Sequence, residues 1–121
     1  MPISLNHTIV EAVDNDRGAR FFAGIMGLVY SGPDRHFAPV RVNESLTLDF
    51  LATPEPRGAH LAFDVDPTTF DAALTRLKAS GIPYGDDPST PDNGGTNHPL
   101  CARGLYFTDD SGNLYELMSP A

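Results

Sequence analysis

The chain has 121 residues, of which 40% are hydrophobic, 20% charged and 9% aromatic, a composition that indicates one globular domain over residues 1–121 and excludes a disordered chain. Its formal net charge of −8 argues against nucleic acid or an anionic membrane as a partner, because binding phosphates needs clustered Lys and Arg. No apolar run approaches the roughly 18 residues of a membrane span. A single cysteine, Cys101, excludes an intramolecular disulfide. We therefore expect a reduced, cytoplasmic protein with no membrane partner.

The first half of the chain opens with residues 5–11, which alternate between the two faces of a predicted strand and place His7 on one of them. An acidic stretch follows, and apolar residues at helix spacing then predict a helix that ends at Gly27. Short strands are expected after this helix at Leu28–Ser31, Phe37–Asn43 and Ser45–Ala52.

The second half repeats this order. Residues 59–66 predict a strand that carries His60. Asp66-Pro67 is a favourable helix start, because the first turn of a helix leaves its N–H groups unbonded and proline has none to lose. The helix is expected to end at Gly81. Strands are then predicted at Ile82–Tyr84, Gly104–Thr108 and Leu114–Met118.

Matching spacings indicate that one βαβββ unit occurs twice. His7 precedes Gly27 by 20 residues (27 − 7), and His60 precedes Gly81 by 21 (81 − 60). Prolines interrupt both helix and strand patterns between the two units. The sequence therefore predicts an α+β fold of two tandem modules. Module 1 spans about residues 1–53, a linker spans 54–58, and module 2 spans about 59–121.

Three side chains on predicted strands could bind a metal ion: His7, His60 and Glu116. The two histidines occupy matching positions of the repeat, while Glu116 shares a strand face with Leu114 and Met118. Burying an unpaired carboxylate there would cost free energy, which a divalent ion between two neutral imidazoles would offset. Such a set leaves positions open for substrate or water and suits Fe, Mn, Ni or Zn. On the residues alone, solvated histidines and an ion-paired glutamate are an equally open alternative.

Four further residues could surround such a site. Asp49 occupies the position in the first module that corresponds to the candidate carboxylate ligand, and could be a fourth ligand, a general base, a substrate contact or a structural side chain. His98 lies in a long loop, residues 85–103, of a length that usually indicates function or mobility; it could touch a ligand or be solvated. Arg103 and Tyr106 could hold an anionic or aromatic substrate, or be ordinary rim residues.

Four segments carry a resemblance to a known family. They are Leu5–Val10, the helix end at Gly27-Leu28, Ala59–Phe63, and Arg103–Leu117. Together they resemble the vicinal oxygen chelate superfamily, which includes glyoxalase I, the bleomycin-resistance proteins, the fosfomycin-resistance enzymes and the extradiol dioxygenases. The last segment is the most specific, because it is similar to the family's strand–turn–strand ending, G-x-x-F-x-D-x-x-G-x-x-x-E.

The resemblance implies two βαβββ modules whose mixed sheets curl into a cup, with a divalent metal ion held there by His7, His60 and Glu116. It also implies a homodimer, in which the partner subunit often completes the cup. In glyoxalase I the fourth ligand is a carboxylate on the strand where this chain has Asp49. Asp49 is one methylene shorter than the usual glutamate, so the chain departs from the glyoxalase pattern.

The leading functional hypothesis is a metal-dependent enzyme of glyoxalase or dioxygenase type that acts on a small oxygenated molecule. Two neighbouring substrate oxygens would occupy the open positions of the ion, with Glu116 and Asp49 as the catalytic carboxylates. The alternative is a protein of the bleomycin-resistance type, which would sequester an antibiotic or another aromatic ligand in a largely apolar cup without catalysis.

Overall fold

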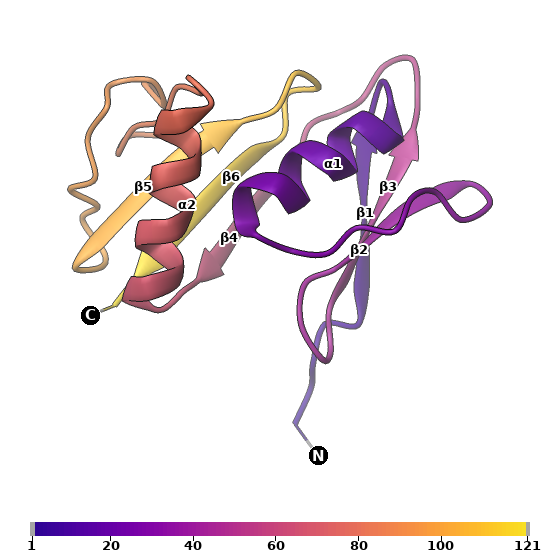
Figure 1. Cartoon of the computed structure of the whole chain (residues 1–121), viewed down its shortest axis with the longest axis horizontal. Helices are drawn as coiled ribbons and strands as arrows, with labels where there is room; N and C mark the ends of the chain where they lie inside the picture. Colours follow the sequence, from indigo (N-terminus) through magenta and orange to yellow (C-terminus); the bar gives the residue numbers. More distant parts are fainter. Residues whose placement is uncertain (1, 121) are drawn as a thin grey trace.

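The computed structural model describes residues 2–120 and contains two helices and two three-stranded sheets, one helix and one sheet from each half of the chain (Figure 1). The first half forms β1 (His7–Ala12), α1 (Asn15–Met26), β2 (Phe37–Arg41) and β3 (Thr47–Ala52). The second half forms β4 (His60–Asp64), α2 (Pro67–Ala79), β5 (Arg103–Thr108) and β6 (Leu114–Ser119). The predicted α+β fold of two repeated modules is confirmed.

Both sheets have the same topology, with strand orders β1-β3-β2 and β4-β6-β5. In each, the central strand pairs in parallel with the strand before the helix and antiparallel with its other neighbour. A parallel pair needs a crossover connection, and α1 and α2 supply it. In the parallel pairs, His7 lies opposite Thr47 and His60 opposite Leu114. The sequence repeat is therefore a structural repeat.

Local sequence signals explain where the helices begin and end. Asp14 caps α1 by accepting a hydrogen bond from a backbone N–H of the first turn, and Gly27 ends the helix with φ 72°, a left-handed conformation that glycine adopts without strain. Asp66 caps α2 in the same way, accepting from the Thr69 N–H at 2.7 Å, and Pro67 occupies the first helical position.

Two predicted strands, residues 28–31 and 82–84, are irregular in the structure. In the first segment, the Tyr30 hydroxyl donates to Asp16 of α1 at 2.6 Å, so that the chain folds back on the helix instead of pairing with a sheet edge. The second segment is not assigned to a strand, and the residue after it, Gly85, forms an isolated bridge with Tyr106 of β5. Within residues 2–120, each module therefore has the order βαββ, without the extra edge strand that the sequence pattern predicts.

One hydrophobic core joins the two modules. The Phe22 ring of α1 lies 6.2 Å from that of Phe50, 5.6 Å from that of Phe63 and 5.1 Å from that of Tyr115, measured between ring centroids. These three rings belong to β3, β4 and β6, so α1 contacts both sheets. Neither helix in the described part of the chain is long and apolar enough to cross a membrane.

Each sheet turns one face toward the helices. The other face is called uncovered because no helix packs on it; in the second sheet, part of the loop that carries His98 lies on this face. In the first sheet, His7 and Ile9 are exposed on the uncovered face, whereas the alternate residue Val10 is buried. In the second, His60 and Asp64 are exposed on the uncovered face. We call these surfaces the His7 face (the outer side of β1-β3-β2) and the His60 face (the outer side of β4-β6-β5).

Tyr30 allows the contact between residues 28–31 and α1 to be tested through pH. Burial and the hydrogen bond to Asp16 raise the pKa of Tyr30 to about 12. An unfolded tyrosine has a pKa of about 10. Between that pH and about 12, the native chain therefore keeps a proton that the unfolded chain loses. The contribution to stability is complete below that pH and disappears as the pH rises through about 12. We expect the free energy of urea unfolding to fall between about pH 10 and about pH 12, less steeply in Tyr30→Phe. Equal slopes would contradict the contact.

Candidate metal centre

Glu116 is the centre of a polar cluster on the His60 face. Its side chain is buried on the central strand β6. Oε1 lies 2.8 Å from Nε2 of His60, and Oε2 lies 2.6 Å from Nε2 of His98. The parallel register of β4 and β6 sets Ala62 opposite Glu116, so His60, two residues earlier, lies on the same face. Each carboxylate oxygen therefore has one imidazole nitrogen as a partner.

The cluster keeps Glu116 ionised. Burial by itself raises the pKa of Glu116, but hydrogen bonds from His98, His60 and Tyr106 outweigh burial, and the pKa lies below its ordinary value. At neutral pH the group is a carboxylate with both oxygens oriented. A buried carboxylate beside an accessible imidazole is a pair of donors suited to a divalent cation.

His98 and Tyr106, two of the predicted substrate contacts, are part of this cluster. The His98 side chain is only 1% exposed, although it lies in the long loop. Tyr106 stacks on the His98 ring, with centroids 5.7 Å apart and planes inclined by 23°, and its hydroxyl oxygen lies 3.3 Å from Nε2. Burial and the neighbouring Glu116 raise the pKa of Tyr106. Contact of either residue with a substrate stays a prediction.

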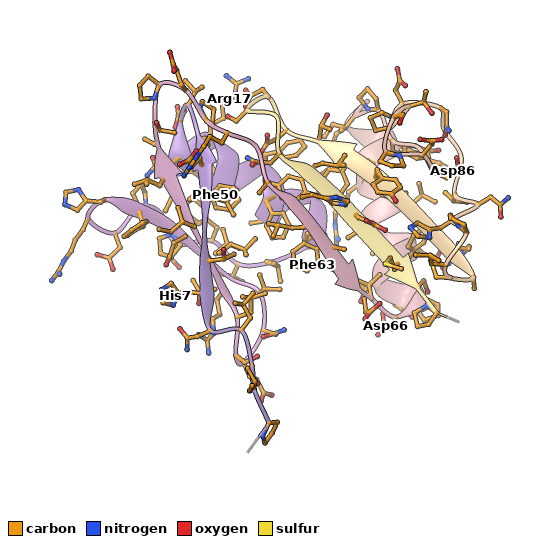
Figure 2. All side chains as sticks on the ribbon, turned by 180° about the vertical axis from the view of Figure 1, so that it is seen from behind. His7, Arg17, Phe50, Phe63, Asp66 and Asp86 are labelled. Atoms are coloured by element: carbon orange, nitrogen blue, oxygen red, sulfur yellow. The ribbon has the colours of Figure 1, made fainter. Side chains whose placement is uncertain are left out.

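His7 and Asp49 lie on the other sheet. Asp49 pairs with Ile9 in the β1-β3 ladder, which places it on the His7 face. The His7 ring is exposed, and its Nδ1 lies 2.8 Å from Oδ1 of Asn6. Figure 2 shows His7 on the opposite side of the molecule from the loop that carries Asp86. Within residues 2–120 of one chain, no group of three His, Cys, Asp or Glu side chains is arranged so that it could hold a metal ion, and this includes the cluster of Glu116 with His60 and His98.

Arg103 lies outside the cluster. Its guanidinium pairs with Asp71 of α2 at 2.7 Å and lies 4.5 Å over the ring of Phe70. Both contacts are with the helix that covers the opposite face of the sheet from Glu116. The structure thus gives Arg103 a role in holding α2 to β5, and its contact with a substrate stays a prediction.

Gly104 belongs to the cluster around Glu116, although it was not predicted from the sequence as a site residue. A Cβ at this position of β5 would lie 2.6 Å from Cβ of His98 and 2.8 Å from Cγ of its ring, closer than atoms can pack. Only glycine therefore lets the loop bring His98 against the strand. A glycine within a strand pattern often marks such a close approach, so the signal was present in the sequence.

No family model and no curated protein matches the chain. Solved structures match over almost its whole length. Oxidase ChaP-H1 is 35% identical with a TM-score of 0.90, covering 99% of this chain and 98% of that one. Oxidase ChaP-H2 is 36% identical with a TM-score of 0.91, covering 100% and 96%. A glyoxalase/dioxygenase from Nostoc punctiforme, 22% identical with a TM-score of 0.71 and covering 98% and 91%, shares the fold. With these matches and its repeated modules, the chain belongs to the vicinal oxygen chelate superfamily.

Proposed function

We propose that this protein is a metal-dependent oxidase that holds Fe(II) with His60 and Glu116 of one subunit and His7 of a second copy. The observation that carries the proposal is the buried, ionised Glu116, presented beside an accessible His60 on an uncovered sheet face. The similarity to two oxidases over the whole chain supports oxidation rather than another reaction of the superfamily. The substrate is a small oxygenated molecule.

The donors fit the ion chemically. The His60 side chain is 52% exposed, and nothing in residues 2–120 hydrogen-bonds to its Nδ1. Its proton can therefore reside on Nδ1, which leaves the Nε2 lone pair for an ion. Glu116 contributes the negative charge. Two imidazoles and one carboxylate, with the remaining positions open, form the donor set typical of non-haem Fe(II) oxygenases.

A second copy is needed because the His7 face and the His60 face of one chain do not meet. The His7 face and the segment before it expose apolar side chains, among them Leu5 at 62% and Ile9 at 49%. Covering these side chains would favour association through the hydrophobic effect. In a dimer with twofold symmetry, the His7 face of each copy lies against the His60 face of the other. This arrangement makes two equal sites and completes the cup.

Each residue then has a distinct task. Iron held by His60, Glu116 and the second copy's His7 would supply the redox chemistry of the oxidase, with dioxygen as the oxidant. Glu116 offsets part of the cation's charge. Asp49, half-buried on the His7 face, is the general base that accepts a proton from a substrate hydroxyl. Half-buried apolar side chains, Leu51 on the His7 face and Leu114 on the His60 face, contact the apolar part of the substrate.

Iron retention and nitric oxide binding test the proposal. After anaerobic loading with Fe(II) and desalting, we expect about one iron per chain, because a three-donor site holds its ion tightly. Nitric oxide, a stand-in for dioxygen, should bind this iron and give the spectroscopic signal of an open ferrous site. Glu116→Gln should lose the iron, whereas Asp64→Asn, a charge change at an exposed position of the same face, should keep it.

A wild-type protein that retains less than about 0.2 iron per chain, the level of non-specific binding, would refute the oxidase proposal. Iron that Glu116→Gln retains as well as the wild type would refute the assigned site. Binding of an aromatic ligand without any iron would instead favour a protein that only sequesters.

A further inference from the structure

Both ring nitrogens of His98 are engaged, and their partners determine where the proton lies. Nδ1 accepts a hydrogen bond from the Leu100 backbone N–H at 3.0 Å, and Nε2 lies 2.6 Å from Oε2 of Glu116. A backbone N–H can only donate, so Nδ1 must present its lone pair. A proton on Nδ1 would set two N–H groups against each other. His98 is therefore the tautomer that carries its proton on Nε2. This N–H group donates a hydrogen bond to Glu116.

His60 differs from His98 at the same carboxylate. Its Nδ1 has no hydrogen-bond partner in the described chain, and half of its side chain is exposed. His60 can change tautomer and free Nε2 for an ion, whereas His98 cannot do so without losing the Leu100 hydrogen bond. The two imidazoles that contact Glu116 are therefore not equivalent donors.

The surroundings of His98 form a closely fitting slot. The ring packs against the backbone of Gly104, where a side chain would leave no room for it, and Tyr106 stacks on the ring. The loop that delivers His98 is tied to itself, because Asp86 accepts hydrogen bonds from the Asn93 side chain at 2.9 Å and from the Asn97 N–H at 3.0 Å. Gly104 also donates its N–H to the Thr96 carbonyl at 3.0 Å, which ties the loop to β5. These contacts hold the ring in place before any ligand arrives.

We propose that His98 is a positioning residue, which holds one oxygen of Glu116 through its Nε2–H and leaves the other oxygen, beside His60, for the ion. His98 is not itself an ion ligand. The effect of His98 on ion affinity rests on the proposed function. The tautomer of His98 does not, because it follows from the two hydrogen bonds alone. Hydrogen bonds of this kind orient a ligand carboxylate, and their loss typically weakens metal binding about 10–100-fold.

Nuclear magnetic resonance of the ¹⁵N-labelled, metal-free protein tests the tautomer directly. We expect the His98 ring to show a protonated Nε2 and an unprotonated Nδ1, with its signals assigned by their absence in His98→Gln. Adding Zn(II), a diamagnetic probe, should leave the Nε2 proton of His98 in place. A proton on Nδ1, or loss of the Nε2 proton when Zn(II) is added, would overturn the proposal.

A matched pair of variants separates the two hydrogen bonds. Glutamine places an amide N–H where His98 has Nε2, so His98→Gln keeps the donor to Glu116. His98→Asn keeps the other hydrogen bond, because the asparagine side-chain oxygen can accept from the Leu100 N–H. Its side chain is too short to donate to the Glu116 carboxylate. We expect Zn(II) affinity, measured against a competing chelator, to fall about 10–100-fold in His98→Asn and less than about threefold in His98→Gln. Equal losses in the two variants would show a merely structural role.

Gly104→Ala provides a test that leaves His98 unchanged. The new methyl group would displace the ring, so we expect the same loss of Zn(II) affinity as in His98→Asn. Gly24→Ala is the control, because a Cβ there meets nothing within 4 Å. Wild-type affinity in Gly104→Ala would contradict the slot. If the wild type binds no Zn(II), the metal-site proposal fails, and the tautomer experiment alone decides whether His98 orients Glu116.

Discussion

A heterodimer of His7→Ala and His60→Ala chains should bind iron, although each variant alone should bind none. In the proposed dimer, each site takes His7 from one copy and the pair His60 and Glu116 from the other. One site of the heterodimer then carries both substitutions, and the other carries neither. We expect about one iron per purified heterodimer, half the content of the wild-type dimer. Two affinity tags on co-expressed chains allow the heterodimer to be isolated, and its iron can then be measured.

The control for this experiment combines two substitutions on the same face. A heterodimer of His60→Ala and Glu116→Gln has one defect in each site, so it should remain without iron. Light scattering of each preparation establishes that dimers are being compared. An iron-free His7→Ala/His60→Ala heterodimer would show that the sites are not shared between copies. Full iron binding by the His7→Ala protein alone would show that His7 is not a ligand.

Phe22→Ala should produce the largest loss of stability in the chain. The ring is fully buried and contacts Phe50, Phe63 and Tyr115, so its removal leaves a cavity among side chains from both sheets. Replacing a buried Phe by Ala typically costs about 3–5 kcal/mol, because lost burial and the cavity add together. Urea unfolding, followed by circular dichroism, measures the change.

Phe21→Ala is the matched control, since it removes the same atoms from the neighbouring position of α1. That ring is half-buried and packs against Phe107 at 6.0 Å, so a smaller loss is expected. Equal losses in the two variants would mean that Phe22 has no special place in the core.

A transition that separates into two steps in wild-type protein would show that the modules unfold independently.

Short-range signals predicted most of the fold. Asp66-Pro67 and Gly27 mark helix boundaries through bonds within a few residues, and the structure follows them. The strands around His7 and His60 were also found, because alternation of burial is a local property. The strand predicted at residues 28–31 was wrong, since an edge strand needs a partner edge and Tyr30 instead finds a hydrogen-bond acceptor on α1.

The site was only partly predictable for a related reason. The pairing of His60 with Glu116 follows from two adjacent parallel strands, and the repeat made both residues conspicuous. The burial of His98 depends on a loop crossing Gly104, a contact that no periodicity encodes. Equivalent positions in a repeat also do not reveal whether two side chains meet within one chain. His7 and His60 match in sequence, yet they lie on separate faces.

The position of Phe22 between the two sheets also bears on communication between sites. Because α1 contacts strands of both modules, the His7 face and the His60 face of a subunit belong to one packed body. In the proposed dimer these faces serve different sites. A ligand that tilts one sheet would therefore shift the donors of the other site, and by linkage the second site would influence the first equally. The shared core would make the dimer a coupled pair of sites.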